Sequence, residues 1–361
     1  MNLKIKIGRS ITIGLGMAFM PFYLLGCAGI GPGSVPRDRF DYTVGISESW
    51  KNQMLLNIVK MRYGDAPVFL EVASITSQYE IAGNINLSAQ WGVNPPYSTT
   101  QIVGAQGTYA DRPTLTYSPL GGEKFAKTMM DPIPPGTILS LIRAGYSAKA
   151  ALRGMANSIN RVRNSFVGGT RTRPADPEFF RLLDKLEILQ ESDILGIHVN
   201  GGESVVTFFY ENVSPEIKKD LQEIKEILGL STEANEFKVV YGSVPGNDQE
   251  IAVLTRSLLE ILKYLGSTID VPIQHVSEKL VNPTMREKSV DESIVKSLIS
   301  VKSSREKPTR AFVAVPYRDY WFWIDERDYD SKGAFSTLMF IFSLAETGEK
   351  GRAPILTIPA R

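Results

Sequence analysis

The chain has 361 residues, with 40 basic against 39 acidic residues, 43% hydrophobic residues and one cysteine. This composition excludes collagen-like, low-complexity and wholly disordered proteins, and the near-zero net charge argues against nucleic acid as a partner. One cysteine excludes an intramolecular disulfide framework and a cysteine-rich zinc site. A chain above ~250–300 residues is expected to form two subdomains or one large elaborated domain.

Residues 1–26 have the pattern of a secretory signal peptide. Lys4, Lys6 and Arg9 form a positively charged start, and residues 11–25 are apolar. This apolar stretch is shorter than the ~20 residues that a membrane-spanning helix needs, and no later stretch is long and apolar enough. We predict that the peptide is removed, which leaves 335 residues with 37 basic and 39 acidic residues and a net charge of −2.

The end of this peptide, Leu24-Leu25-Gly26-Cys27, resembles the lipobox of bacterial lipoproteins. A lipobox needs a small residue before the cysteine, here Gly26, and a thiol to carry the lipid, here Cys27. The resemblance implies acyl chains such as palmitate on Cys27 and, because Ala28 rather than aspartate follows, the outer membrane. Several acyl chains, at ~0.8 kcal/mol per buried methylene, hold a protein at a bilayer. The alternative is an ordinary secretory signal or a membrane anchor with an incidental cysteine.

Residues 27–35 are rich in glycine and proline, which predicts a flexible tether. An N-terminal subdomain is predicted over residues 36–163, beginning with a helix that Ser47 caps. Alternating apolar and polar residues over 73–93 predict a half-buried strand much longer than the usual ~5–6 residues. A second strand-like segment at 101–117 completes a long antiparallel hairpin.

Two structures fit this hairpin. In one, a bent hairpin belongs to an ordinary sheet, with Gly83 or Gly92 at a bulge. In the other, each subunit of a ring contributes its hairpin to a membrane barrel, whose strands also alternate between apolar and polar residues. The polar face of the hairpin fits a solvated sheet surface equally well.

Three short helices are predicted next, at residues 121–130, 137–144 and 147–159. The polar residues 164–177 are the best candidate for a linker between subdomains. Basic residues in and near this linker could meet phosphate or lipid headgroups, although a solvated linker is favoured. They are Arg161, Arg163, Arg171 and Arg173.

A C-terminal subdomain is predicted over residues 178–361, where strand pairs with central turns alternate with helices. The strand pairs lie at 197–211, 237–254 and 311–324. The helices lie at 215–228, 255–265 and 333–345, and a final strand lies at 354–358. The predicted fold class is α+β, with antiparallel sheets, a long N-terminal hairpin and packed helices.

The sequence lacks the linear motifs of common catalytic sites. His198 and His275 are the two histidines, and neither has a second histidine or cysteine at ligand spacing, so we expect no zinc site. Neither a G-x-S-x-G elbow nor a Walker A motif is present, and no cofactor is predicted. A hydrolase that acts through two carboxylates leaves no linear motif and stays open as an alternative.

Two segments are candidates for anion or partner contacts. Asp325 and Asp328 belong to an acidic segment that lacks the glycine and terminal glutamate of a calcium loop. A turn in which Asp330 or Ser331 caps the next helix is the favoured interpretation. Arg256, at the start of a predicted helix, could bind an anion, although pairing with an acidic residue is favoured.

Several segments resemble a family of uncharacterised bacterial lipoproteins of unknown function. They are residues 37–41 with 49–63 (RDRFD, SWKNQMLLNIVKMRY), 111–120 (DRPTLTYSPL), 255–262 (TRSLLEIL) and 320–335 (YWFWIDERDYDSKGAF). The likeness covers most of the chain after the signal peptide. It implies a location in the bacterial outer membrane and no catalytic residues.

The sequence therefore predicts a lipid-anchored protein of the bacterial envelope, facing the periplasm, with a structural or protein-binding role and no evident catalysis. The expected partners are membrane lipid, through acylated Cys27, and an envelope protein or further copies of the chain. One alternative is a subunit of an oligomeric outer-membrane export pore that contributes its hairpin. The other is a carboxylate-based periplasmic hydrolase.

Overall fold

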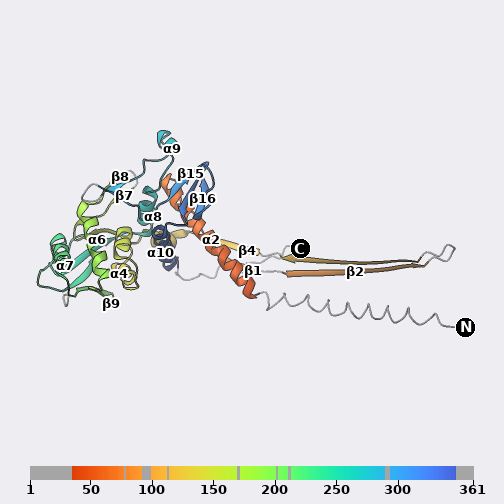
Figure 1. Cartoon of the computed structure of the whole chain (residues 1–361), viewed down its shortest axis with the longest axis horizontal. Helices are drawn as coiled ribbons and strands as arrows, with labels where there is room; N and C mark the ends of the chain where they lie inside the picture. The colour runs from red at the N-terminus through yellow and green to blue at the C-terminus, as the bar shows by residue number, and fades with distance from the viewer. Residues whose placement is uncertain are drawn as a thin grey trace. The chain divides into compact units, whose positions relative to one another are not determined.

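The computed structural model describes residues 35–76, 79–91, 99–111, 114–168, 171–200, 202–209, 213–288 and 293–346. The predicted signal peptide, Cys27, nearly all of the tether and the final strand at 354–358 lie outside these residues. In the described residues, helices accompany several mostly antiparallel sheets, so the predicted α+β class is confirmed (Figure 1). No helix within these ranges has the length and apolar character to cross a membrane.

The chain divides into two units. The first consists of residues 1–49 and 70–119, and the second of residues 50–69 and 120–361. This division differs from the predicted linker at 164–177, where Asn164 and Ser165 are fully buried. The largest sheet of the second unit takes strands from both sides of that segment, so the segment does not separate two cores.

Helix α2 (Val35–Arg62) begins earlier than predicted. Pro36 lies in its first turn, where proline favours helix initiation because its missing N–H has no helical partner there. Ser47, the predicted cap, is therefore an interior residue of the helix. Residues 35–49 are largely exposed and lack the apolar periodicity that reveals the rest of the helix.

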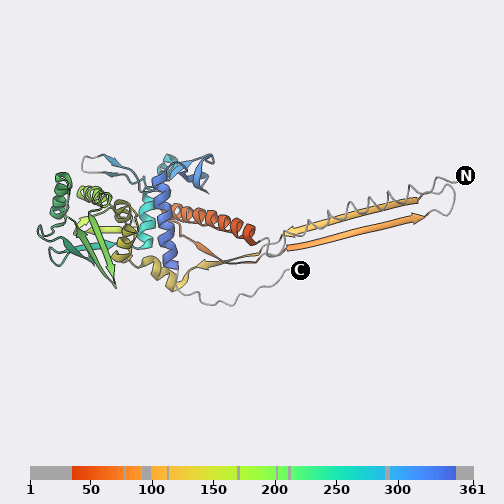
Figure 2. The same cartoon turned by 60° about the horizontal axis from the view of Figure 1, so that its bottom comes forward.

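The long hairpin of the first unit is confirmed as strands β2 (Tyr79–Trp91) and β3 (Thr99–Asp111), while β1 (Phe69–Thr76) pairs with β4 (Thr114–Leu120). Figures 1 and 2 show β2 and β3 running beside each other along their whole length. Their register continues through 13 residue pairs without a shift. Gly83 pairs with Gly107 and is not at a bulge, and Gly92 lies outside the described residues.

The second unit contains a six-stranded sheet in the order β6-β5-β12-β11-β10-β9. Its strands are β5 (Ala156–Ile159), β6 (Val162–Arg163), β9 (Leu195–Asn200), β10 (Glu203–Phe208), β11 (Glu236–Tyr241) and β12 (Glu250–Thr255). Four helices pack on it or on one another: α4 (Pro135–Arg143), α5 (Ala148–Met155), α6 (Pro177–Glu191) and α7 (Pro215–Leu228). Leu139, Leu186 and Leu228 of these helices meet Phe208 and Val253 of the sheet in an apolar layer.

Two predictions in this sheet are wrong. Residues 156–159 were expected to extend a helix, but α5 ends at Met155 because β5 pairs with β12. Strands β11 and β12 were expected to form an antiparallel pair, but they are parallel. Their connection, residues 242–249, is shorter than the dozen or more residues usual between parallel strands.

The rest of the second unit surrounds helices α3 (Gly122–Met130), α8 (Leu258–Ser267) and α10 (Tyr329–Glu346), with a short α9 (Ile273–Ser277). Its small sheets contain β7 (Phe166–Gly168) with β8 (Arg171–Arg173), β13 (Glu287–Lys288) with β14 (Ile294–Val295), and β15 (Lys302–Ser304), β17 (Tyr320–Asp325) and β16 (Ala311–Tyr317). Gly266 lies inside α8, which continues past the predicted helix end at residue 265. A β-carbon there would lie 3.3 Å from the carbonyl oxygen of Ile58 in α2, so this glycine permits a close helix contact.

Candidate functional site

The β2–β3 hairpin is the first candidate surface. Its register pairs Ile81 with Tyr109 and Leu87 with Val103, and it pairs Asn84 with Gln106. Directly opposed residues share a face of an antiparallel pair, so these three pairs match in polarity. The match is incomplete, because Ser88 pairs with Ile102 and Trp91 pairs with Thr99. Among the described residues this sheet has two strands, which leaves one edge of each strand without a strand partner.

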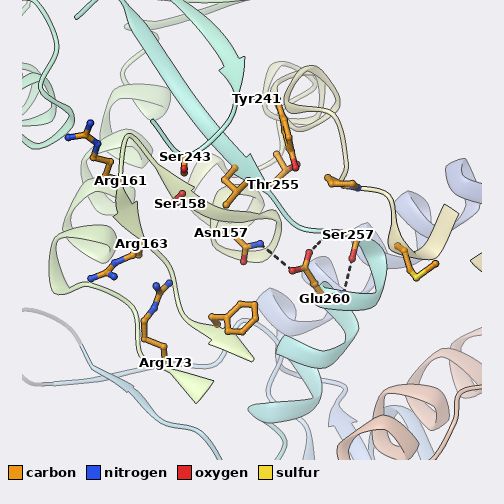
Figure 3. Close-up of a pocket in the computed structure, with 14 residues that line it drawn as sticks. Asn157, Ser158, Arg161, Arg163, Arg173, Tyr241, Ser243, Thr255, Ser257 and Glu260 are labelled. Carbon is orange, nitrogen blue, oxygen red and sulfur yellow. Dashed lines mark hydrogen bonds between the residues drawn. The ribbon is translucent and has the colours of Figure 1, made fainter. Parts of the chain in front are cut away.

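A pocket of about 720 Å³ in the second unit is the second candidate. It lies beside β5, β12 and the start of α8. Figure 3 shows Arg161, Arg163 and Arg173 on one side of the pocket and Glu260 on the other. The hydroxyl residues Ser158, Ser243 and Thr255 lie between these two sides (Figure 3).

A β-bulge shapes one wall of the pocket. Leu254 pairs with Ser158, but the next residue, Thr255, pairs with Ala156, so Asn157 is left without a strand partner. A bulge re-aims side chains and lets neighbouring residues approach the same side of a sheet. Asn157 and Ser158 consequently both line the pocket, although they are consecutive in the strand.

The turn between β5 and β6 places the cationic side of the pocket. Asn160 and Arg161 have φ values of 43° and 73°, a region that non-glycine residues seldom occupy. The Asn160 side chain holds the turn, because its Oδ1 accepts from the Ala252 N–H at 2.6 Å and its Nδ2 donates to the Leu228 carbonyl at 2.8 Å. The two bonds fix the turn to strand β12 and to the end of helix α7.

The three arginines differ in their partners. Arg163 pairs with Asp176, with 3.3 Å between its Nε and a carboxylate oxygen. Arg173 donates from Nη2 to the Asn164 carbonyl at 2.9 Å, but its buried Nε has no hydrogen-bond partner among the described residues. The Arg161 guanidinium is exposed and makes no side-chain hydrogen bond or ion pair with the described part of the chain. Positive charge therefore stays available at this side.

The carboxylate of Glu260 is already engaged. One oxygen accepts from the Ser257 N–H at 2.8 Å, while the Ser257 hydroxyl accepts from the Glu260 N–H at 3.3 Å. This capping box satisfies free N–H groups at the start of α8. The other oxygen accepts from Asn157 Nδ2 at 3.4 Å. Within the described residues the pocket offers this single carboxylate rather than the pair that a carboxylate hydrolase requires.

Two buried hydroxyls in the pocket wall have no partner among the described residues. They belong to Ser158 and Thr255, which are 4% and 2% exposed. Most buried polar groups in native proteins are hydrogen-bonded, so each exception calls for an explanation. The sequence gives no local sign of these hydroxyls, because Ser158 and Thr255 line the same pocket only when β5 and β12 pair.

Arg256, one of the predicted contact residues, lies beside the pocket but inside the fold. It is 2% exposed, and its guanidinium donates to the carbonyl oxygens of Arg153, Gly154 and Ser165 and to Asn157 Oδ1. Burial lowers the pKa of this arginine below its ordinary value. Its donors thus hold the β5 region in place, and its predicted anion contact stays a prediction.

Asp325 and Asp328, the other predicted contacts, stabilise the junction between β17 and α10. Asp325 accepts from the Arg327 backbone and side chain, and these bonds hold the pKa of its carboxyl well below the usual range. Asp328 accepts from the Ser331 N–H at 3.3 Å and from its hydroxyl at 2.9 Å, directly before α10. Asp328 therefore occupies the capping position that was predicted for Asp330 or Ser331, because the helix begins earlier than expected.

The remaining sequence candidates do not converge on either surface. Cys27 and the lipobox residues lie outside the described residues. His198 is exposed in β9, whereas His275 is buried and its Nδ1 lies 2.7 Å from the hydroxyl of Tyr63. Among the residues that the structure describes, no group of three or more histidine, cysteine, aspartate or glutamate side chains could hold a metal ion.

Comparisons with known proteins do not add a family or a fold relative. No protein-family model, no curated protein and no solved structure matches the chain.

Proposed function

We propose that the protein is a lipid-anchored subunit of an assembly in the bacterial outer membrane, with a structural or protein-binding role. In this proposal the β2–β3 hairpin makes the contacts between subunits. The observation that carries it is a ladder of 13 residue pairs in a sheet of two strands. A two-stranded hairpin is at best marginally stable in water, so a hairpin of this length is expected to gain a further partner.

The geometry of the hairpin favours further copies of the same chain as that partner. Strands β2 and β3 run in opposite directions, so the outer edge of β3 in one copy matches the outer edge of β2 in the next as an antiparallel pair. Each added copy again leaves one strand edge for the next copy. Such a contact between copies is heterologous, and it closes into a ring or extends as a filament. Acylation of Cys27 would support assembly by confining the copies to one membrane surface.

The experiment compares two neighbouring substitutions in β2. Leu87 pairs with Val103, and Asn86, which precedes it on the polar alternation, pairs with Gly104. We expect native mass spectrometry and electron microscopy of the detergent-extracted full chain to show oligomers. Leu87→Lys should reduce them to monomers because it places a charge on the apolar side of the alternation, and Asn86→Lys should leave them intact. Monomers alone in the wild type, or equal effects of both variants, would contradict assembly through the hairpin.

The lipid anchor has its own test. Cys27→Ser should prevent acylation and move the protein from the membrane fraction to the soluble fraction, because the acyl chains supply its membrane affinity. A serine variant that stays membrane-bound would contradict the lipid anchor and leave the hairpin proposal untouched.

An export pore is the second candidate, and the length of the hairpin favours it. Strands of 13 residues exceed the ~9–11 residues that a membrane-spanning β-strand needs. We expect wild-type oligomers to conduct ions in planar bilayers, and oligomers of the Asn86→Lys variant to do the same with altered ion selectivity. Oligomers without conductance would instead support a structural assembly.

A further inference from the structure

We propose that the pocket beside β5 and β12 binds a phosphate-bearing ligand that also carries an apolar group. This proposal does not depend on assembly through the hairpin. The volume of about 720 Å³ falls within the ~300–1,000 Å³ typical of small-molecule sites.

The charges around the pocket favour an anion. Arg161, Arg163 and Arg173 line one side, and the single lining carboxylate, Glu260, lies across from them (Figure 3). Asp176 forms an ion pair with Arg163 and, within the described residues, with neither of the other two arginines. Arg161 makes no ion pair within the described residues, and the Arg173 Nε is buried without a partner there. An anion at this side would receive charge-assisted hydrogen bonds from groups that the fold leaves unused.

The two unpartnered hydroxyls point to the same chemistry. Ser158 and Thr255 are more than nine-tenths buried, line the pocket and lack hydrogen-bond partners among the described residues. Each hydroxyl oxygen is covered in the ligand-free wall, and a rotation of its side chain toward the pocket would let it donate one hydrogen bond to an oxygen of a bound anion. A phosphate group, with its several oxygens, can accept from both hydroxyls and from a guanidinium at once, which a carboxylate with two oxygens does less completely.

The lining also includes apolar side chains, which support the second half of the proposal. Phe166, Tyr241 and Leu254 line the pocket, and Phe166 and Tyr241 are among the exposed large hydrophobic residues. Sites for small molecules combine apolar walls with a few placed polar groups. The ligand class is therefore a phosphate ester, either a soluble monoester or a phospholipid headgroup.

The binding experiment uses the full chain extracted in a neutral detergent and isothermal titration calorimetry. The probes are inorganic phosphate, phenyl phosphate and dihexanoyl phosphatidylglycerol. We expect at least one ester to bind more tightly than inorganic phosphate, because the apolar side chains of the lining add contact area. Tighter binding of phenyl phosphate assigns a soluble monoester, and tighter binding of the lipid assigns a headgroup. Absence of binding by all three probes would overturn the proposal.

Three variants locate the site. Arg173→Gln and Thr255→Val should each weaken ester binding by roughly ten-fold, since each removes a donor to a charged group. Thr268→Val is the matched control, because its buried hydroxyl donates to the Leu265 carbonyl and Thr268 does not line the pocket. Binding by the control should match the wild type. Unchanged binding by both pocket variants would overturn the site.

A stability measurement separates loss of binding from loss of folding. Thr255→Val removes a buried hydroxyl that has no partner in the described residues, so it should raise the unfolding temperature of the ligand-free protein. Thr268→Val breaks a formed hydrogen bond and should lower that temperature. A Thr255→Val protein that is more stable but binds the ester less tightly would assign the hydroxyl to the ligand. A fall in its unfolding temperature would show that the hydroxyl serves the fold and would overturn its assignment.

Discussion

Glu287 accepts a hydrogen bond from Arg153 Nη2 at 2.6 Å, between side chains that are 3% and 7% exposed. The same carboxylate accepts from the hydroxyls of Ser165 at 2.7 Å and Tyr264 at 3.1 Å. The guanidinium of Arg256 lies 4.3 Å from the centre of the Tyr264 ring, and burial raises the pKa of Tyr264 to about 12. This network joins α5, α8 and β13.

Glu287→Gln should lower the free energy of unfolding by about 3–5 kcal/mol, because it leaves the Arg153 charge buried without a counter-charge. Urea unfolding at pH 7, followed by circular dichroism, measures the change. The exposed pair of Arg286 and Asp270, at 2.5 Å, supplies the control. Asp270→Asn should cost less than about 1 kcal/mol, and equal losses in the two variants would contradict a special role for the buried pair.

Tyr63→Phe should lower the free energy of unfolding by about 1–2 kcal/mol. The variant removes the hydroxyl that lies 2.7 Å from the buried His275 Nδ1, so the ring nitrogen loses its partner. Thermal unfolding at pH 7 checks this value. Tyr329→Phe is the matched control because Tyr329 is 83% exposed, and its unfolding temperature should equal that of the wild type. An unchanged unfolding temperature for Tyr63→Phe would show that the contact contributes nothing to stability.

Asp325→Asn should change how stability depends on pH. Hydrogen bonds from Arg327 lower the folded-state pKa of Asp325, so its charged form stabilises the fold at pH values above the unfolded-state pKa of about 3.9. This contribution is lost as pH falls toward the lower folded-state pKa. Unfolding temperatures between pH 2 and 7 should therefore show a deficit for the variant at pH 7 that shrinks in acid. The control, Asp41→Asn at an exposed position of α2, should show no such pH-dependent deficit in its unfolding temperature.

Arg161→Gly should leave the free energy of unfolding unchanged or raise it by up to about 1 kcal/mol. A side chain in the left-handed region costs roughly 1–2 kcal/mol, and glycine avoids that cost. Arg163→Gly, in the extended β6, should instead lower stability because it gains flexibility and loses the Asp176 pair. Guanidinium unfolding of both variants measures the difference. A destabilised Arg161→Gly would show that the arginine side chain stabilises the turn.

The long hairpin and most helices follow from local patterns. Period-two alternation predicts β2 and β3, and Ser214 and Pro215 mark the start of α7. The parallel direction of β11 and β12 was missed because the turn residues at 245–248 resemble a hairpin turn. Their pairing is decided within the assembled sheet, where the backbone and side chain of Asn160 also bond Ala252.

Part of the pocket lining was predicted from the sequence. Its three arginines belong to the four in and near the polar segment at 164–177 that were predicted as possible phosphate contacts, although a solvated linker was favoured. The hydroxyls of Ser158 and Thr255 were not predicted as part of a site. Nearly a hundred positions separate the two residues, and only the β5–β12 pairing brings them to the same pocket. Ser257, beside the predicted anion contact Arg256, has the clearer local role as a helix cap.

The position of β12 has a consequence for the folding rate. It lies between β5 and β11, and the Ala252 N–H donates to Asn160 across 92 positions of the chain. The β5–β6 and β9–β10–β11 segments can pair locally, but β12 must close a loop whose entropy costs roughly 4 kcal/mol before it gains its contacts. Insertion of β12 between the two halves of the sheet is therefore expected to be the slow step by which this unit folds.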